Sequence, residues 1–285
     1  MDFVISLEDK IKRYTNNFVG FEDLQLEIKG IVDIIFSNSK NDLTYRNILD
    51  YFDINGNIIL YGKPGVGKTS LAFQIADYVL NSYRIKPYKV DIARIIRSNL
   101  GEATNNMKEA IEYIKNQSKK YGMFLIIDEI DRLFVNRANN NELSELKRML
   151  IEFMDFIDNL KLSDRTVIIG ITNLIDLLDD AFLRRFLFIY KVSNNEHLIV
   201  EYILKSNELL DIEMDKKDIE AYSKKMAKCS IPLNSIKNAY RAIIIKYNKN
   251  NNKNELKKQL INNFNLLLNK DKNYVKKTRD SKNKK

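Results

Sequence analysis

The sequence predicts an α/β fold: a parallel five-stranded sheet sandwiched by helices, followed by a small all-α domain. First, apolar runs of strand length alternate with segments of helical periodicity over the first 192 residues. Second, one of these runs passes through a glycine-rich turn directly into a helix. Third, after about residue 192 the strand signals stop, and the later periodic segments are helical. Alternating strands and helices are typical of a parallel sheet covered on both faces.

The expected elements follow one another in a regular order. Five strands are predicted at residues 57–62, 87–91, 123–128, 166–173 and 186–192. Helices are predicted at residues 3–14, 23–36, 70–80, 102–119 and 142–160, because their apolar residues recur at intervals of three and four. Four further helices, at residues 195–210, 216–228, 233–247 and 254–269, form the all-α domain. Residues 270–285 have almost nothing to bury, and we expect them to be disordered.

Composition and cysteine content indicate a soluble intracellular protein. Of the 285 residues, 45% are hydrophobic and 30% are charged, which is typical of globular domains. The single cysteine, Cys229, fits a reducing cytosol, and with one histidine, His197, the chain cannot assemble a zinc centre or a nucleophilic triad. The stretch MDFVISLEDK at residues 1–10 lacks the basic start and apolar run of a signal peptide, and no run in the sequence approaches the roughly 18 apolar residues of a membrane span. We therefore expect a cytoplasmic protein without a membrane partner.

Positive charge is concentrated at the C-terminus. Residues 246–285 contain 13 Lys and Arg residues against 3 Asp and Glu residues, so this segment alone exceeds the net charge of +9 of the whole chain. A basic tail can bind nucleic acid or an acidic protein. The alternative is a solvated terminus with no binding role. The abundance of lysine and asparagine throughout the chain favours this alternative.

An acidic cluster follows the third predicted strand, in the stretch LIIDEID at residues 125–131. Its first three residues are apolar, as in a strand buried on both faces, yet Asp128, Glu129 and Asp131 come directly after them. Carboxylates this close repel one another, so a positive group must lie beside them for the fold to remain stable.

A second motif predicts what that positive group is. The stretch GKPGVGKT at residues 62–69 follows the first of the five strands and precedes a helix, the context in which G-x-x-x-x-G-K-[ST] forms a phosphate-binding loop, or P-loop. Its backbone N–H groups and the N-terminal end of the helix attract phosphate oxygens. Lys68 can reach the β- and γ-phosphates, and the Thr69 hydroxyl can coordinate Mg²⁺. We expect nucleotide contacts from Gly62, Lys63, Pro64, Gly65, Val66, Gly67, Lys68, Thr69 and Ser70.

Mg²⁺ bound to a nucleotide then explains the acidic cluster. Asp128 would hold the ion together with Thr69, and Glu129 would polarise the attacking water as a general base. Both motifs lie at the carboxyl ends of parallel strands, where ligands collect in open α/β sheets. For Asp131, a helix cap or an ion pair is at least as good an explanation as a catalytic role.

With these motifs in place, the sequence resembles the AAA+ superfamily of ATPases, specifically the classical AAA type, over about residues 18–245. The resemblance implies ATP as the nucleotide. It also implies that residues 18–192 form the α/β nucleotide-binding domain and residues 193–269 the helical lid domain. The N-terminal helix (1–17) and the basic tail (270–285) are predicted from periodicity and composition instead. FVGFEDLQLEIKGIV, which starts at Phe18, is similar to the family's opening segment, so Gly20 would border the adenine. GITN resembles the end of the sensor 1 strand, so Asn173 would position the water or sense the γ-phosphate.

The segment LLDDAFLRRF at residues 177–186 resembles the family's second region of homology. There Arg184 and Arg185 would be arginine fingers that reach the γ-phosphate bound by a neighbouring subunit and stabilise charge on the transferring phosphoryl group. The resemblance thereby implies a homo-oligomeric ring, usually a hexamer. Leu233 stands where many AAA+ proteins carry a sensor 2 arginine, an absence that is typical of the classical AAA type.

Two positions depart from the family's pattern. A substrate-gripping loop usually has a bulky apolar or aromatic residue two places before a Gly-Glu pair, but Asn99 stands there, followed by Leu100 and Gly101. Either Leu100 provides the bulky group or the ring does not thread polypeptide at all. Leu187 follows the Arg-Arg-Phe run, where the family often has an acidic residue, and this difference loosens the fit of the arginine loop.

Three functions fit these features. The first, which we favour, is an ATP-driven ring that remodels protein complexes. The second is a DNA-directed AAA+ protein, such as a helicase loader or a replication or transposition factor, that uses the basic tail. The third is a slow nucleotide switch that regulates a partner. The chain is also similar to small single-module bacterial AAA ATPases, some of them encoded beside a subtilisin-like protease, so a protease is one candidate partner.

Overall fold

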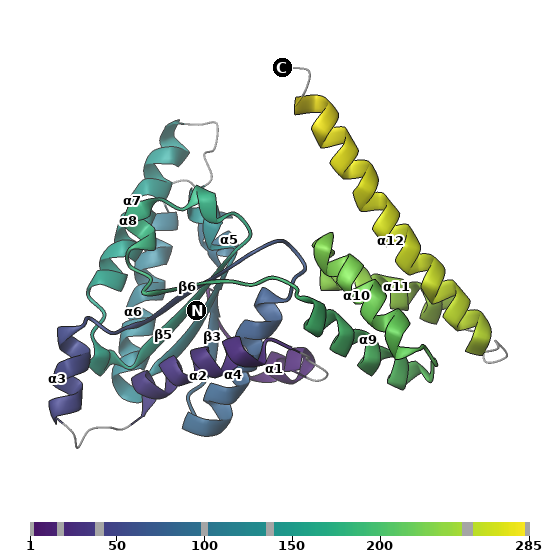
Figure 1. The fold of residues 1–285 in the computed structure, drawn as a ribbon. Coiled ribbons are helices and arrows are strands. Elements are labelled where there is room, and N and C mark those ends of the chain that lie inside the picture. Colours follow the sequence, from purple (N-terminus) through teal and green to yellow (C-terminus); the bar gives the residue numbers. More distant parts are fainter. Residues whose placement is uncertain are drawn as a thin grey trace. The chain divides into compact units, whose positions relative to one another are not determined.

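The computed structural model describes residues 3–15, 20–37, 43–97, 102–134, 140–246 and 253–282 (Figure 1). By their contacts, the residues divide into two compact units. The first unit comprises Met1–Phe18, Glu22–Gly62 and Lys68–Lys191, and the second comprises Val19–Phe21, Lys63–Gly67 and Val192–Lys285. Each unit has a hydrophobic core of its own.

The first unit contains a six-stranded sheet with the strand order β1-β3-β4-β5-β2-β6. Its strands are β1 (Val4–Ser6), β2 (Gly56–Tyr61), β3 (Pro87–Val90), β4 (Met123–Asp128), β5 (Thr166–Thr172) and β6 (Phe188–Lys191). Strands β2 to β6 are parallel to one another, which confirms the predicted α/β sheet of five parallel strands. The sixth strand, β1, was not predicted, and it pairs antiparallel with β3.

The strand β1 corrects the expectation that residues 3–14 form one helix. Val4 pairs with Val90, and the backbone N–H of Leu7 donates to the Pro87 carbonyl at 2.9 Å. The helix α1 therefore begins only at Glu8. The spacing of Phe3 and Leu7 fits a helix as well as a strand, and the backbone groups along the edge of β3 decide between them, because pairing with β1 satisfies these groups.

Eight helices of the described residues belong to the first unit. They are α1 (Glu8–Thr15), α2 (Glu22–Phe36), α3 (Leu43–Tyr51), α4 (Lys68–Tyr83), α5 (Ile92–Arg97), α6 (Ala103–Tyr121), α7 (Asn140–Asp158) and α8 (Asp180–Leu183). Three short 3₁₀ helices cover Ile130–Phe134, Leu162–Asp164 and Ile175–Leu177. The sequence predicted the long helices, whereas α3, α5 and α8 are too short to show clear periodicity.

Alternate residues of β4 pack on opposite faces of the sheet. Met123, Leu125 and Ile127 share one core with buried residues of α6 and α7. The intervening residues Phe124 and Ile126 are also 0% exposed, on the face where α1, α2 and α4 pack together (Figure 1). Because side chains alternate along a strand, Asp128 belongs to the face covered by α4. Asp128, the metal-binding candidate, therefore lies on the same face of the sheet as α4, the helix that follows the P-loop.

The second unit is a helical bundle of α9 (Glu196–Leu210), α10 (Lys216–Lys228), α11 (Leu233–Lys246) and α12 (Lys253–Lys282). Its core includes Ile203, Met226, Tyr240 and Phe264. The helix α12 continues to Lys282, into the range that the sequence assigned to a disordered tail. Its first turns pack on this core, and extending an existing helix adds a hydrogen bond for each residue that becomes ordered.

Candidate active site

The P-loop connects β2 to α4, as its motif requires. Both ends of the loop, Gly62 and Lys68, belong to the first unit. Gly67 has a φ of +108°, and a Cβ there would lie 3.3 Å from the ring of Phe21. Glycine is favoured at this turn mainly for its backbone conformation, and a side chain would also press against the Phe21 ring.

Lys68 is the most buried charged group of the site, with 5% of its surface exposed. Its ammonium donates to the Gly62 carbonyl and to Asn173 Oδ1, each at 2.8 Å. Burial lowers the pKa of Lys68, while the charges of Asp128 and Asp131 act in the opposite direction. The lysine thus lies between the start of the P-loop and the predicted sensor residue, where an anion would relieve the cost of its burial.

Asp128 lies at the end of β4, next to the first turn of α4. Its Oδ2 is 3.4 Å from Thr69 Oγ1 and 3.5 Å from the ammonium of Lys89. Its Oδ1 accepts from the backbone N–H of Glu129 at 3.1 Å. Ser70 follows Thr69 and is half-buried. The structure thus brings together the two predicted magnesium ligands, Thr69 and Asp128.

Glu129 has a left-handed backbone conformation, with a φ of 55°, directly after β4. Its carboxylate forms an ion pair with Arg132, three residues later, and both side chains are about half exposed. A residue other than glycine rarely adopts this backbone conformation, and such strain is concentrated at functional sites. The predicted base is accessible, and in this structure its charge is paired with Arg132.

Asp131 anchors the end of β5. It accepts a hydrogen bond from Thr172 Oγ1 at 2.6 Å, and the same hydroxyl accepts from the backbone N–H of Leu174 at 2.9 Å. Thr172 is only 1% exposed. Asp131 therefore fixes the turn that carries Asn173, a structural role that the sequence left open.

Within the second unit, Gly20 and the middle of the P-loop contact residues of the helical bundle. Gly20 has a φ of +94°, and a Cβ there would lie 1.8 Å from Leu198 Cδ1, so both the backbone conformation and the packing favour glycine. The Gly65 carbonyl accepts from the backbone N–H of Asn234 at 3.2 Å. Leu233, which the resemblance places at the sensor 2 position, packs against the core of the bundle.

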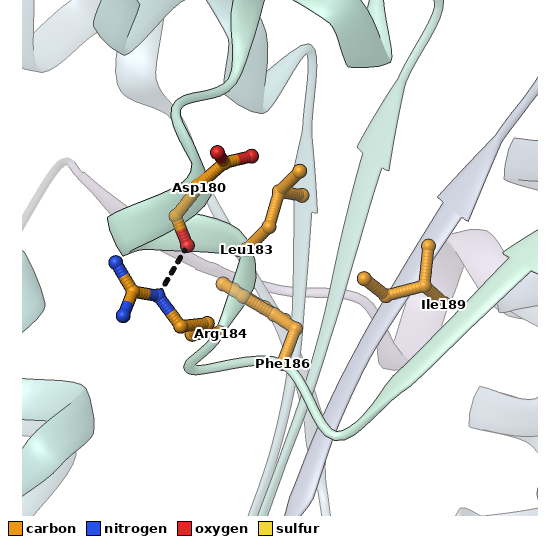
Figure 2. Close-up of a pocket in the computed structure, with 5 residues that line it drawn as sticks. All are labelled: Asp180, Leu183, Arg184, Phe186 and Ile189. Carbon is orange, nitrogen blue, oxygen red and sulfur yellow. Dashed lines mark hydrogen bonds between the residues drawn. The ribbon is translucent and has the colours of Figure 1, made fainter.

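Arg184 and Arg185 follow α8 and differ in their surroundings. The Arg184 side chain is exposed and donates from Nε to the Asp180 carbonyl at 3.1 Å (Figure 2). Arg185 donates to Asp158 Oδ2 at 2.6 Å and to the Ala181 carbonyl, and only 23% of its side chain is exposed. Arg184 is therefore available to another molecule, whereas Arg185 is tied to the end of α7.

A shallow cavity of about 520 Å³ lies beside Arg184. Figure 2 shows the residues that line it, Asp180, Leu183, Arg184, Phe186 and Ile189. Leu187, the residue that departs from the family's pattern, is 44% exposed next to it. The predicted substrate-loop residues Asn99, Leu100 and Gly101 lie outside the described residues.

Sequence reasoning missed three side chains at the site: Lys89, Arg132 and Thr172. Lys89 could have been noticed as a charge within the short strand PYKV. Its contact with Asp128 depends on the pairing of β3 with β4, which a single sequence does not reveal. Thr172 is the last residue of a strand otherwise made of apolar residues and glycine, apart from Thr166 at its start.

The fold and the site define a P-loop nucleotide-binding domain of the α/β class. Residues 58–194 match the family model of the ATPase family associated with various cellular activities (AAA). The chain belongs to the AAA+ superfamily.

Two curated relatives illustrate the similarity. Cell division protein C of Sulfolobus acidocaldarius is 29% identical over 229 residues, which cover 76% of this chain and 56% of the relative. A proteasome-activating nucleotidase of Methanoregula boonei is 33% identical over 129 residues, which cover 45% of this chain and 28% of the relative. The chain thus spans about half the length of the first of these relatives.

Two solved structures share the fold over nearly the whole chain. A chain of the HORMA:CdnC:Trip13 complex of E. coli MS115-1 has a TM-score of 0.73 and 20% identity, with 93% of this chain and 94% of that chain covered. The AAA domain of FIGL-1 in complex with ADP has a TM-score of 0.61 and 15% identity, with 91% and 90% covered. At these identities both similarities concern the fold alone.

None of the helices described for this chain is long and apolar enough to cross a membrane.

Proposed function

We propose that this protein hydrolyses ATP in a homo-oligomeric ring and uses the nucleotide cycle to remodel a protein partner. The observation that carries the proposal is the arrangement around Lys68, which joins the start of the P-loop to Asn173 at 2.8 Å, with the Thr69–Asp128 pair beside it. Such a combination of a buried cation, a hydroxyl and a carboxylate suits a nucleoside triphosphate with its metal ion.

Mg²⁺ fits the donor atoms of this site. Thr69 and Asp128 offer hard oxygen ligands 3.4 Å apart, and Mg²⁺ usually completes its octahedron with phosphate oxygens and water. When bound, the ion neutralises charge on the phosphates. Lys68 would bind the phosphates, Asn173 would orient the attacking water, and Glu129 would accept its proton.

The position of the arginines supports an active site shared between subunits. The Arg185 carbonyl accepts from the side chain of Asn57 at 3.1 Å, at the start of β2, whereas Gly62 follows the end of that strand. A strand rises roughly 3.3 Å per residue, so about 16 Å separate these two ends. Neither arginine can span that distance to the phosphates of its own chain, and a neighbouring copy is the natural target. A hexamer is the ring size that we propose from the resemblance.

Of the two arginines, we assign the finger role to Arg184. Its side chain is exposed, and its one described hydrogen bond, to a backbone carbonyl, leaves the outer guanidinium nitrogens available. Arg185 would instead hold the loop in place through Asp158. A bidentate guanidinium is well suited to the equatorial oxygens of a transferring phosphoryl group.

A protein target is the favoured substrate class. The curated relatives include proteasome-activating nucleotidases, and one structural neighbour comes from the HORMA:CdnC:Trip13 complex. The protein target could be a protease. In a second form of the proposal, the ring is a slow nucleotide switch that regulates such a partner. The basic segment 246–285 is the reason to include DNA in the test, although the comparisons do not support nucleic acid. A cytoplasmic location remains a prediction.

A subunit-mixing experiment tests the shared site. Glu129→Gln subunits keep the finger but lack the base, and Arg184→Ala subunits keep the base but lack the finger. Each should be inactive alone, and a mixture should regain ATPase activity at interfaces that combine an intact Arg184 with an intact Glu129. The control mixes Arg184→Ala with the double variant, which cannot form such an interface.

The outcome of mixing decides between the alternatives. Lack of recovery, together with a specific activity independent of protein concentration in the unmodified protein, would contradict the shared site. Stimulation of the unmodified protein by an unfolded polypeptide supports the protein target. Stimulation by DNA alone would favour the DNA-directed alternative.

A further inference from the structure

Lys89 contacts the carboxylate that is expected to hold the metal. It pairs in register with Ile126 of β4. Paired residues of parallel strands point to the same face, as do residues two apart on one strand, so Lys89 and Asp128 share the face covered by α4. The Lys89 ammonium is 3.5 Å from Asp128 Oδ2, the oxygen that also lies 3.4 Å from Thr69 Oγ1. A cation therefore lies beside the oxygen that Mg²⁺ would use.

The position of Lys89 within the sheet is unusual for a charge. The strand β3 lies between β1 and β4, and Lys89 is paired with Ile5 on one side and Ile126 on the other. Lysine is depleted in strands, and its charged end must reach water or an opposite charge. Here 35% of the side chain is exposed and the ammonium ends at Asp128. Packing alone does not explain a lysine at this position, whereas compensation of Asp128 does.

The three acidic residues at the end of β4 and just after it each have a different cation or hydrogen-bond donor as a partner in this structure. Glu129 is paired with Arg132, and Asp131 accepts from Thr172. Asp128 is paired with Lys89. The repulsion expected within the acidic cluster is thus offset by groups of the chain itself, before any metal ion is considered.

We propose that Lys89 is an internal counter-ion that competes with Mg²⁺ for Asp128. This inference rests on the proposed function and assigns a residue that tunes the metal requirement of the same site. Lys89 neutralises Asp128 while the metal is absent and gives up the contact when Mg²⁺ enters with the nucleotide. The flexible stem and well-hydrated ammonium of lysine suit such an exchange, because the charge can move into water. The site then takes up the metal mainly when nucleotide phosphates supply further oxygen ligands.

The test measures metal binding directly. The full chain is saturated with a non-hydrolysable ATP analogue and titrated with Mn²⁺, and free Mn²⁺ is followed by electron paramagnetic resonance. Lys89→Met removes the charge and keeps most of the stem, so the Kd for Mn²⁺ should fall about threefold to fivefold, the effect of one partly exposed ion pair. Lys89→Arg keeps the charge and should retain an affinity close to that of the unmodified protein.

Lys86→Met is the matched control. Lys86 precedes the same strand and pairs with Glu8 at 3.1 Å, away from the acidic cluster. This variant should bind Mn²⁺ like the unmodified protein. Thermal unfolding of each variant establishes that the titrations compare folded proteins.

The possible results separate this inference from the proposed function. An affinity of Lys89→Met equal to that of Lys86→Met overturns the counter-ion role. Weaker Mn²⁺ binding also overturns it, because the lysine would then assist binding of the metal-nucleotide complex. Nucleotide binding is measured beforehand with a fluorescent ATP analogue in EDTA. If the unmodified protein binds the analogue neither in EDTA nor in the presence of Mg²⁺, the proposed function itself is contradicted.

Discussion

The two ends of the central sheet differ in whether their polar side chains already have partners within the chain. At the carboxyl end, Lys68 is 5% exposed and is hydrogen-bonded to Gly62 and Asn173, and Asp128 is paired with Lys89. At the opposite end, Arg184 is exposed beside an open cavity. The polar groups at the carboxyl end are already hydrogen-bonded or paired with one another, whereas the exposed Arg184 has its one described hydrogen bond to a backbone carbonyl. This difference is what a site divided between two copies requires.

The largest effect should come from Arg184→Ala. An arginine finger contributes about 10³-fold to 10⁵-fold to kcat in phosphoryl transfer, so the variant should lose at least about 10³-fold. ATP binding and thermal stability should change little, because the side chain is exposed and donates only to a backbone carbonyl. Steady-state ATPase rates at saturating ATP, compared with those of Arg185→Ala, provide the measurement. Equal losses in both variants would remove the distinction between the arginines.

Glu129→Gln should have the next largest effect. Loss of a general base costs about 10²-fold to 10⁴-fold in rate. ATP affinity should remain, because Glu129 is not one of the two residues, Thr69 and Asp128, that we propose to hold the metal. Single-turnover hydrolysis and a nucleotide-binding titration separate these two effects. A loss of nucleotide binding with an unchanged single-turnover rate would show that the residue positions the nucleotide rather than the water.

Arg185→Ala should mainly lower stability. The variant loses the ion pair with Asp158, whose side chain is 47% exposed, and the partly buried hydrogen bond to the Ala181 carbonyl. We expect a loss of about 1–2 kcal/mol in the free energy of unfolding, because one partly buried hydrogen bond and one largely exposed ion pair are removed. Denaturant unfolding of Arg185→Ala, Asp158→Ala and the double variant measures the coupling between the two side chains. Additive losses would mean that the pair does not hold the arginine loop.

Much of the fold could be predicted from sequence because its signals are local. Buried parallel strands are apolar throughout, and the P-loop motif fixes the strand before it and the helix after it. The strand β1 could not be predicted, since three residues carry almost no periodicity and β3 supplies the decisive hydrogen bonds. Long-range contacts set the rest of the site. Arg185 differs from Arg184 because Asp158, 27 residues earlier, lies beside it.

The smallest effect concerns Arg132, which pairs with the predicted base. Both side chains are about half exposed, so the pair contributes little to stability, and Arg132→Ala should change the free energy of unfolding by less than about 0.5 kcal/mol. If the pair restrains Glu129, the variant should raise kcat by about twofold, and added salt should raise the rate of the unmodified protein in the same direction by screening the pair.

Arg94→Ala is the matched control for this last comparison, because Arg94 forms an i,i+3 ion pair of the same kind with Asp91 at 3.3 Å. It should change neither kcat nor its dependence on salt. A fall in kcat for Arg132→Ala would reverse the interpretation, since Arg132 would then orient Glu129 for catalysis. The carboxyl end of the sheet would in that case already be set for reaction, and the exposed Arg184 of a neighbouring copy would be the one group that it still lacks.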